Sequence, residues 1–360
     1  MIHPIKMLDM KRLAYYQAEL RAKPVLKYLY FELTNRCNLY CRHCGSECTG
    51  TNSDYLDVEY IRNTLESVVK KYESSGIMIC LTGGEPMLHP GVFDVIHYAH
   101  ELGFPTGMTS NGTMINRIAA RQLAQAGLDT IAVSLDGMEA EHDAFRNVSG
   151  SYFKALNGIR NLRSAGIEPQ VLTVVHKGNI HQLQEMYRML LKMNVYSWRL
   201  VNIEPIGRAA MQPEIILGAE ETRDLFEFIR EKRFNQSNVM EVTYGCSHFV
   251  TLEYEREIRD YYFQCGAGTF VASIMANGDI GACLDIERRK DLIQGNIYKD
   301  EFINIWENRF FQFRLDRTIK SETCRKCEYR SICVGDSAHT WDYDLNEPRY
   351  CISNGLLDWG

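Results

Sequence analysis

The chain has 360 residues, of which 45% are hydrophobic and 24% are charged, the composition of an ordinary soluble globular protein. Its formal net charge of −6 and its lack of clustered Lys and Arg argue against a nucleic-acid partner and against an anionic-membrane patch. The N-terminal residues MIHPIKMLDMKRL carry no signal-peptide core, and no segment reaches the roughly 20 apolar residues of a membrane span, so we expect a cytoplasmic protein.

The pattern of apolar residues predicts a short N-terminal extension followed by alternating strands and helices. Residues 1–24 form the extension, with an amphipathic helix over 7–20. Strand-like runs occur at 28–34, 77–82, 105–110, 130–135, 170–175 and 198–203, and helix-like stretches at 57–72, 91–102, 115–126, 153–165 and 180–193. Six strand–helix units indicate parallel strands with right-handed crossovers, hence an α/β barrel or part of one, with ligand chemistry at the carboxyl ends of the strands.

Three cysteines follow the first predicted strand in the segment CNLYCRHC. Cys37, Cys41 and Cys44 are separated by three and then two residues, so one short loop can place three thiolates around an iron–sulfur cube and leave the fourth iron open. Three cysteines together with His43 could also form a tetrahedral zinc site. Because the chain has no export signal, its twelve cysteines favour metal ligation over disulfides in either case.

Further motifs follow the later strands. They are Leu81-Thr82-Gly83-Gly84-Glu85-Pro86, Thr109-Ser110-Asn111-Gly112, Ser134-Leu135-Asp136-Gly137, His142-Asp143-Ala144-Phe145-Arg146 and Pro205-Ile206-Gly207-Arg208-Ala209. Together with the cysteine segment, this series resembles the radical S-adenosylmethionine (radical SAM) superfamily. The resemblance implies a partial (β/α)6 TIM-like barrel that is open on one side, a 4Fe-4S cluster on the three cysteines, and SAM chelating the open iron.

The resemblance also implies roles for residues of these motifs. Gly83, Gly84 and Glu85 would grip the SAM amine, since glycine lets the backbone approach a ligand closely. Ser134 and Arg146 would hold the SAM carboxylate, because an arginine fork and a hydroxyl suit a carboxylate in a partly dry pocket. The other expected SAM contacts are Ser110 and Asn111 at the ribose and His43 at the adenine. Taken singly, a serine or asparagine of this kind would be interpreted as a turn residue or cap.

After residue 209 the pattern changes, and seven of the twelve cysteines lie in the remaining segment. An amphipathic helix over 220–234 comes first, and Asn277-Gly278-Asp279 is a turn signal inside a predicted hairpin. The cysteines from Cys265 to Cys351 follow the arrangement Cys-x12-Gly-x4-Cys, gap, Cys-x2-Cys-x5-Cys, gap, Cys. This arrangement resembles the SPASM extension of radical SAM enzymes, which holds two auxiliary 4Fe-4S clusters. A pair of structural zinc knuckles is the alternative.

The ligands of the auxiliary clusters follow from the same resemblance. The inner cluster would be held by Cys265 and Cys283, and it is short of ligands because Ser337 stands where the fullest pattern has another cysteine. Cys246 is the candidate third ligand, with a buried thiol as the alternative. The outer cluster would be held by Cys324, Cys327, Cys333 and Cys351. The expected cofactors are therefore three 4Fe-4S clusters and SAM.

Three further residues receive an interpretation. Cys48 and Cys80 are interpreted as packed thiols, although Cys48 lies close to the first cysteine segment. Asp285 is a candidate catalytic acid or base, with a surface carboxylate as the alternative. The chain then divides into a helical extension (1–24), a barrel (25–215), a helical bridge (216–245) and a small Cys-rich SPASM domain with a hairpin and helices (246–360).

The expected activity is reductive cleavage of SAM to a 5'-deoxyadenosyl radical, which abstracts a hydrogen atom from the substrate. Most families with this pairing modify ribosomally made peptides by crosslinking, epimerisation or oxidation, so the expected substrate is a peptide encoded nearby. A small molecule or tetrapyrrole side chain is the alternative, because some haem-pathway enzymes share a similar CRHC segment. A non-catalytic metal-binding scaffold is the third interpretation. For an enzyme, the expected electron donor is a flavodoxin or ferredoxin.

Overall fold

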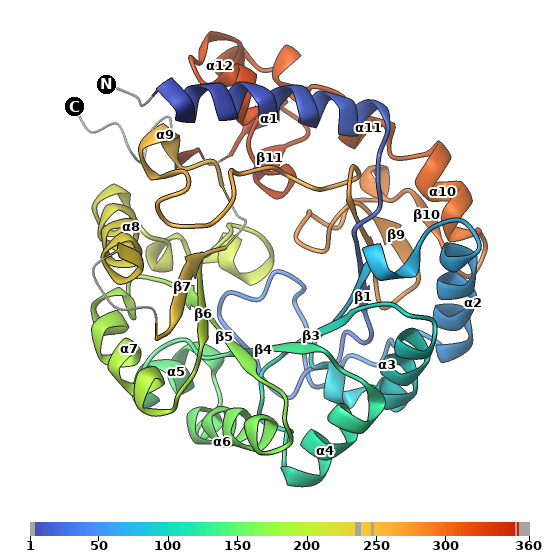
Figure 1. The fold of residues 1–360 in the computed structure, drawn as a ribbon, viewed down its shortest axis with the longest axis vertical. Coiled ribbons are helices and arrows are strands. Elements are labelled where there is room, and N and C mark those ends of the chain that lie inside the picture. The colour runs from blue at the N-terminus through green and yellow to red at the C-terminus, as the bar shows by residue number, and fades with distance from the viewer. Residues whose placement is uncertain (1–3, 235–238, 246–247, 350, 353–360) are drawn as a thin grey trace.

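The structure, a computed structural model, describes residues 4–234, 239–245, 248–349 and 351–352. In this part of the chain, ten strands form one sheet in the order β10-β9-β8-β1-β2-β3-β4-β5-β6-β7. Figure 1 shows the sheet bending into an open ring, with helices along its outside and the C-terminal segments across the upper side. The α/β fold with a partial barrel is therefore confirmed, and the barrel does not close.

All six predicted barrel strands are present, and neighbouring strands from β1 to β7 run parallel. A separate two-stranded sheet contains β11 and β12. The strands are β1 Tyr28–Glu32, β2 Met78–Thr82, β3 Thr106–Ser110, β4 Thr130–Ser134, β5 Pro169–Val175, β6 Ser197–Asn202, β7 Glu241–Tyr244, β8 Val271–Ile274, β9 Asp279–Gly281, β10 Gly295–Asn296, β11 Trp341–Asp342 and β12 Glu347–Pro348.

The helices begin and end where local signals place them. Asn116 caps the start of α4 by accepting hydrogen bonds from two backbone N–H groups, and Gly127 ends the same helix at a φ of +89°, as expected for these residue types. A helix able to span a membrane is not found among the described residues. The helices are α1 Pro4–Ala22, α2 Val58–Val69, α3 Val92–Glu101, α4 Arg117–Ala126, α5 Glu139–Arg146, α6 Ser151–Ser164, α7 Leu183–Lys192, α8 Ala219–Phe234, α9 Thr251–Tyr254, α10 Phe302–Asn308, α11 Phe311–Arg314, α12 Glu322–Lys326 and α13 Arg330–Cys333.

Burial alternates along the barrel strands. In β6, Trp198 and Leu200 are fully buried among the side chains of the helical layer, whereas Arg199 and Val201 between them are only partly buried. The strands β2 and β5 show the same alternation. Because successive side chains of a strand point to opposite faces, the partly buried positions face the interior of the barrel. Solvent-sized space therefore reaches the inner face of the sheet.

The C-terminal hairpin is joined to the barrel. β8 pairs antiparallel with β9 through a turn at Gly278, whose φ is +84°, which confirms the predicted hairpin. β8 also pairs in parallel with β1, and Tyr28 lies opposite Val271. On the far side of the sheet, β7 extends the barrel by pairing with β6. The segments that follow residue 215 therefore continue the barrel sheet at both of its edges.

A buried ion pair holds the segment between β7 and β8. Glu255 and Arg259 are both fully buried and 3.0 Å apart, and Arg259 also donates to the carbonyl oxygens of Gly245 and His248. We expect Glu255→Gln to lower the free energy of unfolding by about 3–5 kcal/mol, since it leaves a buried guanidinium without its counter-charge. Denaturant unfolding measures this difference. Glu257→Gln, which removes a more exposed pair with Lys6, is the control and should change stability by less than about 1 kcal/mol.

Candidate active site

The three cysteines after β1 line one cavity. Cys37, Cys41 and Cys44 belong to residues 37–48, here called the cluster loop, and border a cavity of about 190 Å³ at the carboxyl ends of the strands. Arg208 anchors this loop by donating hydrogen bonds to the carbonyl oxygens of Cys41 and Cys48. The cavity, here called the thiol cavity, is also bordered by Leu39, His43, Gly45, Ser46, Cys48, Thr82, Gly83, Gly84, Thr109, Ser110, Asn111, Ser134, Arg146, Arg208 and Asp285.

The surroundings of these sulfur atoms suit iron ligands. The backbone N–H of Leu39 donates to Cys37 Sγ over 3.4 Å, and Arg146 Nη1 donates to Cys41 Sγ over 3.5 Å. Hydrogen bonds of this kind stabilise the thiolates of iron–sulfur sites. Burial raises the pKa of Cys37 to about 12, so this thiol needs a bound cation to ionise near neutral pH. The residues present therefore fit a 4Fe-4S cluster with three protein ligands.

Cys48 is buried like a packed thiol, but it lies at the wall of this site. It is 1% exposed and borders the thiol cavity. It also hydrogen-bonds Cys44, and this bond lowers the pKa of Cys44 to about 6. By contrast, Cys80 lies on β2, as predicted, and does not border the thiol cavity.

Gly83 and Gly84 pack against the start of the cluster loop. A Cβ on Gly83, whose φ is +152°, would lie 2.5 Å from the carbonyl oxygen of Thr34. A Cβ on Gly84 would lie 2.2 Å from the carbonyl oxygen of Arg36. Because side chains are excluded at both positions, the backbone itself borders the thiol cavity. A polar group of a ligand can therefore approach this backbone, as predicted for the SAM amine.

Glu85 has a different place from the two glycines. It is fully buried and does not border the thiol cavity. Its carboxylate accepts hydrogen bonds from Ser110 Oγ and from the backbone N–H of Asn111, both over 2.8 Å. Glu85 thus ties the turn after β2 to the turn after β3, and Ser110 and Asn111 are the members of this set that border the cavity. A direct contact between Glu85 and SAM stays a prediction.

Arg146, at the end of α5, is held by Asp136. Two nitrogen atoms of its guanidinium contact Asp136 Oδ2, and Asp136 is fully buried, with Oδ1 accepting from the backbone N–H of Val174. Burial alone would lower the pKa of Arg146, but the negative charge of Asp136 outweighs it and raises that pKa. Arg146 is therefore a fixed cation beside Cys41, and it borders the thiol cavity together with Ser134.

His43 belongs to a stack of three rings. Its ring lies 4.5 Å from that of Phe145 at an angle of 6°, and Phe145 lies 3.9 Å from His176 at 9°. Burial lowers the pKa of His43, so its imidazole is neutral. His43 Nδ1 is buried and has no hydrogen-bond partner among the described residues. A ring with one face supported and one polar atom unsatisfied suits a heteroaromatic ligand, in line with the predicted adenine contact.

Four cysteines of the C-terminal segment surround a second cavity. This cavity has a volume of about 20 Å³, and its lining includes residues of both α12 and α13. The backbone N–H of Asp336 donates to Cys333 Sγ over 3.2 Å, and the Ser321 hydroxyl caps the start of α12 by accepting from Cys324 N–H. The arrangement fits the predicted outer cluster. The cysteines that line it are Cys324, Cys327, Cys333 and Cys351.

The inner position has fewer thiols. Cys265 accepts a hydrogen bond from the backbone N–H of Ala338 over 3.3 Å. Burial alone would raise the pKa of Cys265, but Arg317 and the hydrogen bonds at its sulfur lower it. Cys283 is the second thiol in this region. Both thiols lie close enough to Tyr343 to raise the pKa of its hydroxyl. The predicted third ligand, Cys246, lies outside the described residues, so the described ones supply two thiols and the total of three clusters stays a prediction.

Comparison with known families decides which chemistry this set of sites belongs to. The model of the radical SAM superfamily matches residues 31–190, and the model of the SPASM iron–sulfur cluster-binding domain matches residues 265–328. The chain is a radical SAM enzyme with a SPASM domain. Iron–sulfur ligation is therefore preferred over the zinc alternatives at both cysteine segments.

Individual relatives of this radical SAM enzyme differ in what they make. The AdoMet-dependent heme synthase of Nitratidesulfovibrio vulgaris is 27% identical over 347 residues, which cover 90% of this chain and 92% of the relative. The mycofactocin maturase MftC of Mycolicibacterium smegmatis is 27% identical over 85% of this chain and 76% of its own. The crystal structure of Streptococcus suis SuiB bound to S-adenosylmethionine has a TM-score of 0.72 and 18% identity, covering 87% of this chain and 73% of SuiB. The last likeness shows the fold.

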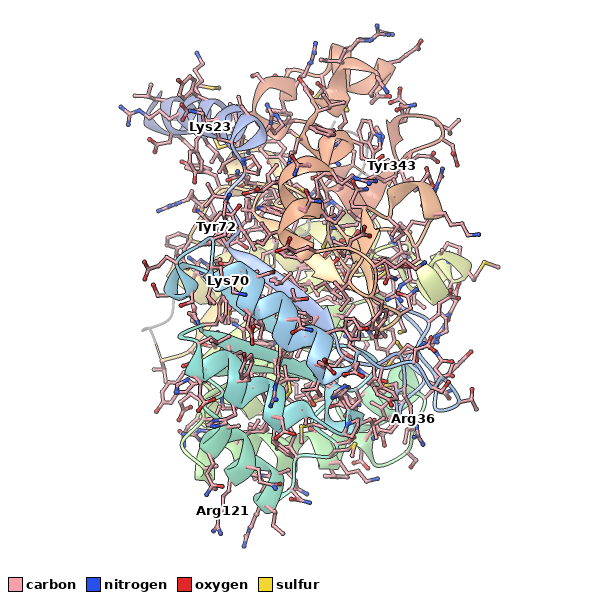
Figure 2. All side chains as sticks on the ribbon, turned by 90° about the vertical axis from the view of Figure 1, so that its right-hand side faces the viewer. Lys23, Arg36, Lys70, Tyr72, Arg121 and Tyr343 are labelled. Atoms are coloured by element: carbon pink, nitrogen blue, oxygen red, sulfur yellow. The ribbon has the colours of Figure 1, made fainter. Side chains whose placement is uncertain are left out.

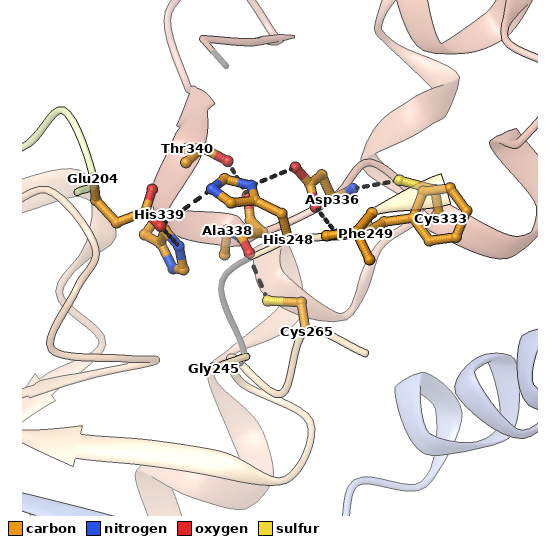
Figure 3. A network of polar contacts seen from close by, with 12 residues as sticks. Glu204, Gly245, His248, Phe249, Cys265, Cys333, Asp336, Ala338, His339 and Thr340 are labelled. Atoms are coloured by element: carbon orange, nitrogen blue, oxygen red, sulfur yellow. Dashed lines mark hydrogen bonds and ion pairs between the residues drawn. The ribbon is translucent and has the colours of Figure 1, made fainter. Parts of the chain in front are cut away.

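A buried polar network in this radical SAM enzyme connects the loop after β6 to C-terminal segments of the chain. Glu204, which follows β6, lies 3.2 Å from His248 Nε2 and 3.4 Å from His339 Nε2. His248 Nδ1 in turn lies 2.9 Å from Asp336 Oδ2. Figure 3 shows these side chains pointing toward one another, with Asp336 also reaching Cys333. Burial alone would lower the pKa of His248, but Glu204 and Asp336 raise it to about 10.

Asp285 brings this network to the thiol cavity. Asp285 borders that cavity. Its carboxylate lies near His339, whose charge acts to lower the pKa of Asp285, and near Glu204, whose charge acts to raise it. The protein atoms around its carboxylate are the largest cause that raises the pKa of Asp285, although the residue is exposed. Asp285 is exposed, as in the surface interpretation, and it also borders the thiol cavity. Its catalytic role stays a prediction.

The sequence alone assigned no functional role to several of these residues. Asp136 and Glu204 each lie two residues beyond the end of β4 or β6, so the rule that function gathers at the carboxyl ends of parallel strands could have found them. His248 and His339 come from two separate segments after residue 245, and His339 lies in a short 3-10 helix over Ala338–Thr340. Only the folded structure brings them to Glu204.

The ion pairs of Glu204 predict a dependence of stability on pH. Burial alone would raise the pKa of Glu204, but His248 and His339 outweigh it and lower it. A carboxyl whose folded pKa lies below the ordinary value of about 4.3 stabilises the fold above that value, and this stabilisation is lost as the pH falls. We therefore expect Glu204→Gln to lower the free energy of unfolding at pH 7 by about 2–4 kcal/mol, with a difference that shrinks below about pH 4.

Urea unfolding followed by circular dichroism from pH 7 down to about pH 2 measures this difference. Glu214→Gln is the control, because Glu214 is 62% exposed and pairs with Arg42 at the surface. A Glu204→Gln protein as stable as the wild type at pH 7 would contradict the ion-pair interpretation.

Proposed function

We propose that this radical SAM enzyme modifies a side chain of an iron tetrapyrrole. The observation that carries the proposal is the similarity to a heme synthase, which extends over nine-tenths of both chains. The alternative stated from the CRHC segment is thus preferred over a peptide substrate. The coarser activity, SAM-dependent radical chemistry, does not depend on this choice.

The residues at the thiol cavity have separate tasks in this proposal. Cys37, Cys41 and Cys44 hold the 4Fe-4S cluster, and bound SAM and cluster together supply a 5'-deoxyadenosyl radical for hydrogen abstraction. Arg146, fixed by Asp136, neutralises the carboxylate of SAM. The remaining predicted contacts to SAM come from the backbone of Gly83 and Gly84, the side chains of Ser110, Asn111 and Ser134, and the ring of His43.

The other side of the cavity is available to the substrate. Asp285 borders the thiol cavity, and its carboxylate lies near the Glu204–His339 pair. Asp285 is the carboxylate placed to bind or deprotonate a substrate group. The outer cluster lies beyond this network and is connected to it through Asp336. A flavodoxin or ferredoxin as electron donor, and cytoplasmic residence, stay predictions.

Anaerobic turnover tests the proposal. The reconstituted enzyme is incubated with SAM, a chemical reductant and iron coproporphyrin III, an iron porphyrin with carboxylate side chains. We expect 5'-deoxyadenosine to form faster with the porphyrin than without it, and the porphyrin to change in mass. An unchanged porphyrin and an unchanged rate of SAM cleavage would contradict a tetrapyrrole substrate.

A peptide substrate is the second candidate, because the maturase MftC matches this chain at the same identity as the heme synthase. The same assay separates the two, with a short peptide encoded beside the gene in place of the porphyrin. SAM cleavage that depends on the peptide would favour the maturase activity of crosslinking, epimerisation or oxidation. The absence of 5'-deoxyadenosine under all conditions would point to the non-catalytic scaffold.

A further inference from the structure

One cation inside the barrel has no counter-charge among the residues that the structure describes. Arg199 lies on β6 between the fully buried Trp198 and Leu200, which face the helical layer. Its side chain therefore points to the interior face of the sheet. The positive charge of Arg199 acts to lower the pKa of the Cys80 thiol. Cys80 lies on the interior face of β2. The guanidinium thus extends into the space that the curved sheet encloses, where β6 faces β1 in Figure 1.

The described residues leave one nitrogen of this guanidinium unsatisfied. Arg199 Nε is buried and has no hydrogen-bond partner, and no ion pair of Arg199 occurs in the described part of the chain. The carboxylate of Glu32, on β1, is already bound by Arg288 and by the backbone N–H of Ala276. Glu204 is bound by histidines. An interior arginine that no carboxylate of the described residues pairs with is available to bind an anion from outside the chain.

The position of Arg199 relates it to the SAM site without making it part of that site. Arg199 pairs with Leu172 on β5, and Leu172 pairs with Ser134 on β4. Arg199 therefore lies in the same layer of the barrel as Ser134, two strands or about 10 Å away. It is absent from the lining of the thiol cavity, where Arg146 stands beside Ser134. An anion held by Arg199 is thus a neighbour of SAM and a separate group from the SAM carboxylate.

We propose that Arg199 binds a carboxylate of the substrate and thereby fixes which part of the substrate faces SAM. This inference rests on the proposed function, because an iron tetrapyrrole with carboxylate side chains supplies the anion. A guanidinium can hold a carboxylate through two parallel hydrogen bonds, which sets orientation as well as affinity. Arg199 is accordingly a specificity-determining residue rather than a ligand of the cluster or of SAM.

Binding of iron coproporphyrin III to the cluster-loaded enzyme tests this assignment without turnover. Quenching of tryptophan fluorescence measures the affinity for the porphyrin and for its carboxamide derivative, in which the side chains are uncharged. We expect Arg199→Gln to weaken binding of the carboxylate form by about tenfold or more and to leave binding of the carboxamide and of SAM unchanged. Arg199→Lys, which keeps the charge, should lose less. Arg121→Gln is the control, because Arg121 lies on the exposed outer face of α4 (Figure 2).

Thermal stability separates this role from a structural one. If Arg199 binds an anion that is absent from the free enzyme, Arg199→Met should leave the unfolding midpoint of the substrate-free enzyme unchanged or raise it. The same change should remove most of the increase that the porphyrin causes in the wild type. A structural arginine would give the opposite change, a lower midpoint or a protein that does not fold, and either result would overturn the assignment.

The outcomes also distinguish this inference from the proposed function. Equal affinity of the wild type and Arg199→Gln for the carboxylate porphyrin would overturn the role of Arg199 and leave the tetrapyrrole substrate in place. A wild-type enzyme that binds neither porphyrin would overturn the proposed function, and this inference with it. Weaker binding of SAM to Arg199→Gln would assign Arg199 to the SAM site instead.

Discussion

Replacing Cys37, Cys41 and Cys44 together by Ala should abolish formation of 5'-deoxyadenosine and remove about four irons per chain. The three thiols border one cavity, and hydrogen bonds reach the sulfur atoms of Cys37 and Cys41. Without them, no thiolate of this loop remains except Cys48. Since the cluster is the source of the electron that cleaves SAM, we expect activity below detection. Iron analysis and chromatography of the anaerobic reaction measure both quantities.

Cys80→Ala is the matched control for this experiment. Cys80 is a partly buried thiol on β2 and does not border the thiol cavity, so its replacement should change neither iron content nor SAM cleavage. The outer ligands provide a second comparison, because Cys324→Ala with Cys327→Ala should remove iron and leave SAM bound. SAM cleavage that survives the triple change at the cluster loop would defeat the assignment of this loop.

Arg146→Ala should weaken SAM binding by about 2–3 kcal/mol, or roughly 30- to 150-fold, which is the effect of a lost charge-assisted hydrogen bond. Asp136 holds the guanidinium at the cavity wall, and Arg146 also contacts Cys41. The arginine is therefore fixed before SAM arrives, and little entropy is lost on binding. Equilibrium binding to the reconstituted protein measures the affinity. We expect Asp136→Asn to have a smaller effect in the same direction, because the cation remains but loses its anchor.

The matched control is Arg42→Ala, which removes an arginine of the cluster loop that bonds Gln212 and Glu214 instead. It should leave SAM affinity within about twofold of the wild type. Iron content must be equal in all variants, so that loss of SAM binding is not a loss of the cluster. Unchanged SAM affinity in Arg146→Ala, at full iron content, would remove Arg146 from the site.

Local patterns in the sequence were sufficient to predict the strands of the barrel. Each strand from β1 to β6 lies within a predicted run, apart from single residues at the ends of β5 and β6, because apolar positions with a period of two or of about 3.6 record which face is buried. α5 was not predicted as a helix. It has eight residues and no side-chain cap at its start, so neither periodicity nor a capping signal marks it.

Contacts between distant segments could not be predicted in the same way. The pairing of β8 with β1 joins residues about 240 positions apart, and no local signal encodes such a partner. The network of Glu204, His248 and His339 likewise joins segments that are distant in the sequence. The motif residues at the thiol cavity were found because each follows a strand, and parallel strands bring their carboxyl ends together. Asp136 was named only as part of a motif, since the sequence does not show which arginine it faces.

The pairing of β8 with β1 has a consequence for synthesis of the protein. As the chain leaves the ribosome, β1 forms early, but one of its edges has no partner until residue 274 has been made. An unpaired strand edge is a template for association with other chains. A truncated protein that ends at residue 215 would keep this edge exposed, together with the edge of β6 that β7 covers in the whole chain. We therefore expect the isolated barrel to aggregate during expression, and the complete chain to need protection by chaperones until its hairpin is in place.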